Sequence, residues 1–197
     1  GADISDQAAV TAAVGAAVAV HGPLRGVIAN AGIGGPNEPG ADDRFDQLVA
    51  TNLNGTYYTV RAAEPHLSAD GGAHVVLTSS ILGRFGVPGY TGYCASKTAL
   101  IGLARALALE WADRGVQVNA ICPGWVATDM AWEGIDGMAA GMGITREEAL
   151  AQAMRAVPLG RMSQPEDIAG MVAWLVSADA RGVTGQALDM NGGAWMG

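Results

Sequence analysis

Apolar and polar positions along the chain follow two alternating patterns, which predict helices separated by short strands. Between residues 6 and 21 the valines recur every four positions, at Val10, Val14 and Val18, and so lie on one face of a helix. Residues 24–30 then form an apolar run with the length of a buried strand. Both patterns continue to the end of the chain and predict helices at 43–67, 91–114, 146–156 and 165–177, and strands at 73–78, 116–121 and 186–190.

Strands that alternate with helices are typical of a parallel sheet covered on both faces, so we predict the α/β class. A length of 197 residues suits one domain over residues 1–197, and no repeat or linker divides it. Met, Gly and Trp crowd the stretch from about 125 to 157, which we interpret as a substrate lid. Within it, Gly137–Gly143 has the spacing of a phosphate-binding turn, but no strand precedes it, so we predict a flexible loop.

Composition and charge exclude several classes of protein. Half of the residues are hydrophobic and 15% are charged, which excludes a disordered chain. The net charge of −8 argues against binding to nucleic acid or to an anionic membrane. The apolar run at 8–20 is shorter than the roughly 20 residues that a membrane span needs. Two cysteines and three scattered histidines have no metal-ligand spacing, and we expect no metal and a reducing, cytoplasmic compartment.

Polar residues gather where the predicted strands end. Asn30 follows the first strand, Ser79 and Ser80 follow the second, and Thr128 comes shortly after the third. Ligands of open parallel sheets bind outside the carboxyl ends of the strands. The binding site is therefore expected at this edge of the sheet.

Tyr93 and Lys97 carry the clearest chemical signal. A spacing of four residues puts them one turn apart on the same face of a helix, and Lys97 is the only lysine of the chain. A free phenol has a pKa of about 10, and a neighbouring ammonium group lowers it. Such a pair can donate and accept a proton in a reaction. The alternative interpretation is a solvated pair on a helix surface.

Five features in register resemble the short-chain dehydrogenase/reductase family. They are Asn30-Ala31-Gly32 after a strand, Asn52, Ser80 thirteen residues before Tyr93, the Tyr93–Lys97 spacing, and Pro-Gly-Trp-Val-Ala-Thr-Asp-Met at 123–130. The resemblance extends from Asp3 to Gly193. It implies a Rossmann-like, doubly wound parallel sheet and an NAD(P)-dependent enzyme that interconverts a secondary alcohol and a ketone.

The resemblance implies a role for each of four residues. Tyr93 would be the general acid/base, and Lys97 would lower its pKa and hold the nicotinamide ribose. Ser80 would hydrogen-bond the substrate oxygen, whereas Ser79 would only bond at the strand end. Asn52 would hold a water molecule of the proton relay through its backbone, with Asn54 as its competitor.

The resemblance also implies residues that contact NAD or NADP, between which the sequence does not distinguish. Asp3 and Ile4 would meet the adenine, although Asp3 could instead cap the first helix. Thr128 could equally cap a helix. The remaining candidates follow the first and third strands: Asn30, Ala31, Gly32, Pro123, Gly124, Val126 and Thr128.

The family normally begins with a strand, a glycine-rich turn and a helix that together hold the cofactor pyrophosphate. No such turn precedes Asp3, so we expect roughly 60 residues of N-terminal strand–helix units to be missing. The first strand would then have an open edge, and residues 1–197 alone are expected to bind the cofactor poorly or not at all. The alternative function is an inactive fragment or a non-enzymatic binding scaffold.

The expected partners are a small alcohol or ketone and further copies of the chain. Apolar residues after Ser80, such as Phe85, and in the predicted lid, such as Trp132, predict a substrate with an apolar part, although they could equally be packing or interface residues. By resemblance, the helices at 43–67 and 91–114 would pair with a second subunit in a homodimer or homotetramer.

Overall fold

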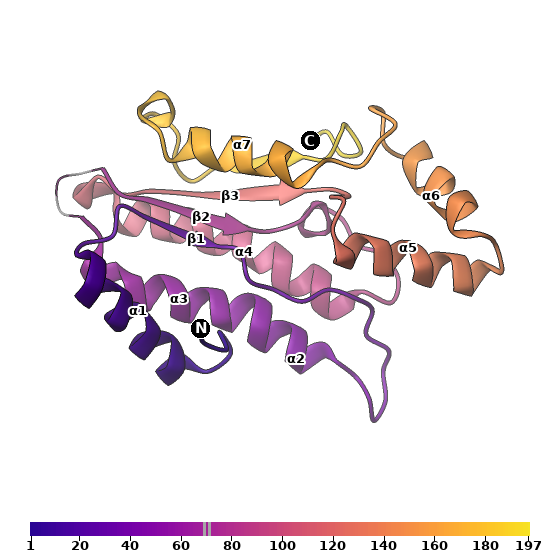
Figure 1. Ribbon diagram of the computed structural model, residues 1–197, viewed down its shortest axis with the longest axis horizontal. Helices are drawn as coiled ribbons and strands as arrows, with labels where there is room; N and C mark the ends of the chain where they lie inside the picture. Colours follow the sequence, from indigo (N-terminus) through magenta and orange to yellow (C-terminus); the bar gives the residue numbers. More distant parts are fainter. Residues whose placement is uncertain (69, 71) are drawn as a thin grey trace.

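Four parallel strands form one sheet in the computed structural model, in the order β1 (Gly26–Ala29), β2 (His74–Thr78), β3 (Gln117–Pro123) and β4 (Ala187–Met190) (Figure 1). The structure describes residues 1–68, 70 and 72–197. The register places Val27 beside Val75 and Leu77 beside Ala120. The predicted α/β class is therefore confirmed. β1 lies at one edge of the sheet, and its Ile28 side chain is 44% exposed.

Helices cover both faces of this sheet (Figure 1). α1 (Gln7–His21), α3 (Thr56–Ala63) and α4 (Thr91–Glu110) lie on one face, and α7 (Pro165–Leu175) lies on the other. Neighbouring residues of a strand point to opposite faces. Leu77 accordingly joins the cluster that contains Trp111 of the α3–α4 layer, whereas Val76 packs with Leu175 of α7. Burial of these two apolar layers fixes the strand ends in space.

The predicted helix at 43–67 is a helical segment, but it is not one regular α-helix. It begins as α2 (Phe45–Val49), continues through the π-helix η1 (Ala50–Gly55) and α3, and ends in the 3-10 turn η2 (Glu64–His66). Ile4 packs so closely on this segment that a Cβ on Gly55 would lie 2.7 Å from Ile4 Cγ1. The spacing of apolar residues does not reveal such an insertion. π-helical turns occur frequently at functional sites, and this one contains Asn52.

The stretch predicted to be a lid forms two helices, α5 (Asp129–Met142) and α6 (Arg146–Arg155). The prediction of a flexible loop at Gly137–Gly143 is wrong, because all but the last of these residues lie in α5. Ile135 and Ala139 are buried in a separate cluster between α5 and α6, and this packing outweighs the low helix propensity of glycine. Only Gly143, with φ of 65°, takes the left-handed conformation that ends the helix.

Other boundaries differ from the prediction by a few residues. The first strand is shorter than predicted, since Leu24 makes only an isolated bridge with Leu67. β3 is longer, because Pro123 still pairs with Met190 as its last residue. Short 3-10 turns complete the chain: η3 (Ile81–Gly83), η4 (Ala112–Arg114) and η5 (Ala178–Ala180). None of the described helices is long and apolar enough to span a membrane.

Candidate active site

Lys97 stands at the centre of a polar cluster at the carboxyl end of the sheet. α4 begins at Thr91, so Tyr93 lies in its first turn and Lys97 lies one turn later. Lys97 Nζ is 5.7 Å from the centre of the Tyr93 ring and donates a hydrogen bond of 2.8 Å to the carbonyl of Thr78, the last residue of β2. On the other side, a Cβ on Gly32 would lie only 3.4 Å from Nζ. The ends of β1, β2 and α4 thus meet at this ammonium group.

Burial changes the acid–base properties of Lys97. Its side chain is almost wholly enclosed, and this desolvation lowers the pKa of Lys97 from 10.5 to about 8. At neutral pH the amine remains mainly protonated and can donate hydrogen bonds to a ligand. Strongly shifted pKa values in a polar cluster are a common mark of functional sites.

The pKa of the Tyr93 phenol lies above its ordinary value of 10. Burial raises the pKa of Tyr93, and the Ser80 side chain opposes this shift without reversing it. The net shift is therefore upward and desolvation is its largest cause. The Lys97 ammonium group is hydrogen-bonded to the Thr78 carbonyl, and its influence on the Tyr93 pKa stays a prediction. Tyr93 holds its proton at neutral pH and can act as a proton donor.

Ser79 and Ser80 have separate partners at the end of β2. The Ser80 side chain caps η3 by accepting a hydrogen bond of 3.1 Å from Leu82 N–H. Ser79 Oγ donates a hydrogen bond of 2.7 Å to the Lys97 carbonyl, so it joins this segment to α4. Gly83 also packs against the Lys97 carbonyl, since a Cβ on Gly83 would lie 3.1 Å from the Lys97 carbonyl oxygen. These contacts hold the Ser80 turn against the helix that carries Tyr93.

The buried Asn52 side chain holds the loop that follows β1. Its Oδ1 accepts a hydrogen bond of 2.8 Å from Ile33 N–H, and its Nδ2 donates to the Ile33 carbonyl at 3.0 Å. Nδ2 also lies 3.2 Å from Ser96 Oγ on α4. The competing Asn54 is exposed. The geometry thus places Asn52, rather than Asn54, between the β1 loop and α4.

The remaining candidate cofactor residues occupy the ends of β1 and β3. Asn30 and Ala31 are exposed directly after β1, and Gly32 faces Lys97. Pro123 ends β3, and Gly124 packs against Asn191, where a Cβ would lie 2.9 Å from the Asn191 Cβ. Val126 follows in the half-buried segment that leads into α5. These residues border one edge of the sheet.

Two alternatives based on helix capping can now be decided. Asp6, not Asp3, caps α1, while Asp3 Oδ1 accepts hydrogen bonds from Ser5. Thr128 occupies the N-cap position of α5, but its side chain makes no capping hydrogen bond and instead donates to the Val126 carbonyl at 3.3 Å. Neither Asp3 nor Thr128 therefore has its side chain committed to a helix cap.

An ion pair that sequence reasoning missed joins the Ser80 turn to β4. Arg84 directly follows η3 and makes two hydrogen bonds of 3.0 Å to the Asp189 carboxylate. Its Nη2 also donates to the Ala187 carbonyl at 2.6 Å. The Arg84 guanidinium is thus occupied by an internal carboxylate. No local pattern could reveal a pair separated by 105 residues in the chain.

We expect Arg84→Gln to lower the free energy of unfolding by about 1 to 3 kcal/mol, because it leaves the largely buried Asp189 carboxylate unpaired. Urea denaturation of Arg84→Gln, Asp189→Asn and the double variant measures the coupling energy. The matched control is Arg25→Gln at the exposed Arg25–Asp70 pair, for which at most about 1 kcal/mol is expected. Equal losses at the two arginines contradict a special role for the Arg84 pair.

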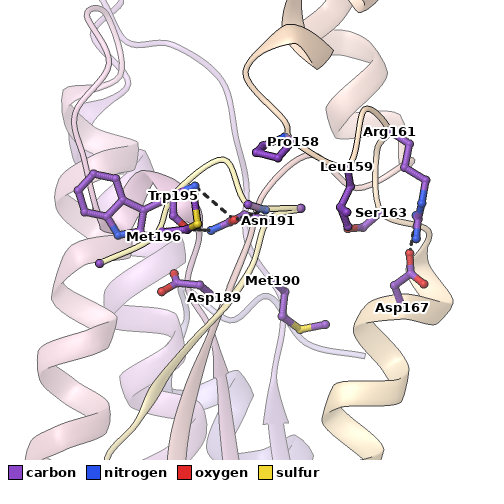
Figure 2. A pocket seen from close by; sticks show the side chains of 13 residues that line it. Pro158, Leu159, Arg161, Ser163, Asp167, Asp189, Met190, Asn191, Trp195 and Met196 are labelled. Atoms are coloured by element: carbon purple, nitrogen blue, oxygen red, sulfur yellow. Dashed lines mark hydrogen bonds and ion pairs between the residues drawn. The ribbon is translucent and has the colours of Figure 1, made fainter.

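Two hollows adjoin this region. One, of about 670 Å³, lies beyond the carboxyl end of β4, between the loop after α6 and the C-terminal tail (Figure 2). Asn191 organises that tail by bonding to Gly193 and to the backbone of Trp195. The other, of about 550 Å³, lies between α4 and residues 83–86. The Trp195 and Phe85 rings are 5.6 Å apart, so the tail also packs on the segment that follows Ser80.

Comparisons with known proteins find relatives that match almost the whole chain. Residues 1–194 match the family model described as enoyl-(acyl carrier protein) reductase. The 4-formylbenzenesulfonate dehydrogenase of Comamonas testosteroni is 38% identical, with 97% of this chain aligned to 75% of that protein. A 3-oxoacyl-(acyl-carrier-protein) reductase of Staphylococcus aureus is 33% identical over 99% of this chain and 76% of its own length.

Solved structures also superimpose on almost the whole chain. Actinorhodin polyketide ketoreductase with NADPH superimposes with a TM-score of 0.92 at 34% identity, over 98% of this chain and 76% of that chain. A short chain dehydrogenase family protein from Francisella tularensis gives a TM-score of 0.89 at 28% identity, over 98% and 79% of the two chains. The present chain thus spans about three quarters of these relatives.

Proposed function

Because the chain belongs to the short-chain dehydrogenase/reductase family, we propose that it is an NAD(P)-dependent oxidoreductase that interconverts a secondary alcohol and a ketone. The observation that carries the proposal is the meeting of a buried Lys97 with Tyr93, Ser80 and Asn52 at the carboxyl end of the sheet. Three separate elements bring these groups together. A solvated surface pair of Tyr93 and Lys97 does not account for a lysine residue that is only 5% exposed.

The residues present fit the nicotinamide end of a dinucleotide. Lys97 is hydrogen-bonded to one carbonyl of the described residues, so its other N–H groups remain available for ribose hydroxyls. Gly32 leaves the approach to this amine free of a side chain. Residues 123–128 provide backbone and the Thr128 hydroxyl at the neighbouring strand end. When bound, the nicotinamide supplies a hydride donor or acceptor.

The proposed proton chemistry belongs to Tyr93 and its neighbours. Tyr93 donates its proton to the ketone oxygen during reduction and accepts one during alcohol oxidation. The Ser80 hydroxyl donates a hydrogen bond to the same oxygen, where negative charge develops. Lys97 binds the cofactor ribose and stabilises negative charge on Tyr93 after the proton has left. Asn52 holds the β1 loop and the start of α4 in one geometry.

The relatives support a carbonyl substrate. The superimposed polyketide ketoreductase is described with NADPH, and the Staphylococcus aureus relative is named a 3-oxoacyl reductase. The apolar Phe85–Trp195 pair stands beside the segment that carries Ser80, which favours a substrate with an apolar part.

We include NAD and NADP as alternative cofactors. A homodimer or homotetramer is part of the proposal, supported by exposed apolar side chains such as Tyr57 and Leu109 on α3 and α4.

The test combines cofactor titration with a substrate screen. Purified protein is titrated with NADH and NADPH by fluorescence, and ketones that carry apolar groups are then offered with the cofactor that binds. Saturable binding, which is expected to be weak for residues 1–197 alone, and cofactor oxidation that depends on a ketone are the expected results. Saturable binding with no turnover of any ketone or alcohol contradicts the proposal.

Ser80→Ala is expected to lower kcat by about 100-fold, because it removes one donor from the developing oxyanion. Ser79→Ala is the matched control, since Ser79 bonds to the Lys97 carbonyl rather than facing the proposed substrate. Steady-state kinetics at a saturating cofactor concentration make the comparison. If Ser79→Ala reduces kcat as much as Ser80→Ala while both remain folded, the assignment of Ser80 is wrong.

A second candidate function is a non-catalytic binding scaffold. It is favoured by one relative, the inactive 2-(S)-hydroxypropyl-CoM dehydrogenase 2 of Xanthobacter autotrophicus, which is 35% identical to this chain. The scaffold hypothesis predicts ligand binding without turnover. Retention of Tyr93, Lys97, Ser80 and Asn52 in one cluster supports the enzyme over the scaffold.

A further inference from the structure

Asn37 is a buried polar residue that the proposed chemistry does not use. It lies in the loop after β1, seven residues beyond Asn30, and is 5% exposed. Its side chain bonds to two segments, the nearby residues before α2 and the distant start of α4. A buried side-chain amide with several partners is costly to disrupt, because removing it leaves those partners unsatisfied.

The first contact of Asn37 is with α4. The side chain of Tyr90, the N-cap residue of α4, makes no capping hydrogen bond. Asn37 Oδ1 accepts a hydrogen bond of 2.8 Å from Gly92 N–H instead. Asn37 also bonds to Thr91 Oγ1, with Nδ2 at 2.9 Å. The helix that carries Tyr93 and Lys97 therefore begins on a cap supplied from 55 residues away.

The second contact of Asn37 is with Asp43. Asn37 Nδ2 donates a hydrogen bond of 2.9 Å to Asp43 Oδ1, and the same oxygen accepts from Phe45 N–H at the start of α2. The carboxylate orients the amide so that its oxygen faces α4. One side chain thus links the starts of α2 and α4.

The packing around Gly92 leaves little freedom for this helix start. A Cβ on Gly92 would lie 3.1 Å from both Leu48 Cδ1 and Phe45 Cα, and 3.3 Å from Asn37 Oδ1. Tyr93 is the next residue along the helix. A shift of the Asn37 loop therefore reaches the Tyr93 backbone directly.

We propose that Asn37, oriented by Asp43, is a positioning residue that sets the place of Tyr93 by capping α4 from outside the helix. The inference rests on the proposed function, in which Tyr93 transfers the proton. Asn37 itself touches neither the proposed substrate nor the cofactor residues. Reactions depend steeply on placement, and an error of about 1 Å can cost on the order of 100-fold in rate.

The test compares Asn37→Ala with Asn119→Ala. Asn119 is also a buried asparagine whose side chain bonds to a distant loop, through Val183 and Gln186, and these hydrogen bonds do not involve the start of α4. We expect both variants to lower the urea midpoint. Only Asn37→Ala is expected to lower kcat, by about 10- to 100-fold, with KM for the ketone changed much less. An equal loss of kcat in the two variants, or none in Asn37→Ala, overturns the proposal.

Hydrogen exchange gives a readout that does not depend on activity. In Asn37→Ala the amides of residues 91–97 are expected to exchange faster, whereas Asn119→Ala leaves them unchanged. Unchanged exchange in Asn37→Ala overturns the capping role. A wild-type protein that binds cofactor but turns over no ketone contradicts the proposed function instead, so the two failures are distinguishable.

A polarity exchange tests the link to Asp43. Asn37→Asp keeps the acceptor for Gly92 but places a carboxylate against Asp43. Adding Asp43→Asn restores a donor and acceptor at this contact. We expect the double variant to recover kcat to within about threefold of wild type, and Asn37→Asp alone to remain impaired. Recovery of the urea midpoint without recovery of kcat overturns the positioning role.

Discussion

Tyr93→Phe is expected to lower kcat by about 100- to 10,000-fold, the contribution typical of a positioned general acid or base. The substitution removes only the phenol oxygen. Burial raises the pKa of Tyr93, so the phenol is neutral in the native protein at pH 7, and phenylalanine replaces it without loss of a charge. The stability of the fold and the affinity for the cofactor should change little. Steady-state kinetics and a cofactor titration on the same preparation measure both effects.

Tyr58→Phe is the matched control for this prediction. It removes the same atom from a half-buried tyrosine of α3, which lies away from the proposed site. Its kcat should stay within about twofold of wild type, as is usual for a substitution away from functional features. A Tyr93→Phe protein that keeps most of its activity means that another group transfers the proton.

Lys97→Met is expected to produce two effects, one on activity and one on the pH dependence of stability. Loss of the ammonium group removes the ribose donor and the positive charge beside Tyr93, so kcat/KM should fall by about 100-fold or more. In the folded protein the pKa of Lys97 is about 8, against 10.5 for the free side chain. Folding therefore disfavours the protonated amine.

The sign of the pH effect follows from this lowered pKa. Below pH 8 the folded protein must keep a buried charge, and the full penalty is present. As the pH rises from about 8 to 10.5, the folded state loses this proton before the unfolded state does, so wild type gains stability relative to Lys97→Met. The relative gain is about 3 kcal/mol at 1.36 kcal/mol per pKa unit. Urea denaturation of both proteins at pH 7 and pH 10.5 measures it, and a pH-independent difference between them contradicts the assigned burial effect.

Local spacing predicted the parts of the site that lie on single elements. Tyr93 and Lys97 stand one turn apart because a helix repeats about every four residues, and Ser80 follows β2 because the apolar run ends there. The direction of the Tyr93 pKa shift was not predictable in this way. It depends mainly on how far the fold buries the phenol, and then on the Ser80 side chain, which opposes the shift.

The errors in the fold have a similar cause. Glycines at 137–143 favour a loop by propensity, yet Ile135 and Ala139 bury one face of α5 against α6. The π-helix around Asn52 accompanies the close packing of Ile4 on Gly55, a contact across 51 residues. Arg84–Asp189 and Asn37–Gly92 are likewise long-range contacts. Tertiary packing determines each of these features, and the spacing of apolar residues along the chain does not reveal it.

The most direct test of the proposed function is a single-turnover reaction of the wild-type protein and Tyr93→Phe with a reduced nicotinamide and an apolar ketone. We predict that wild type oxidises one nicotinamide for each alcohol formed. Tyr93→Phe should bind the nicotinamide with similar affinity but oxidise it at least about 100-fold more slowly. Equal rates in the two proteins, or bound nicotinamide that no ketone oxidises, would contradict the assignment of this cluster as an oxidoreductase site.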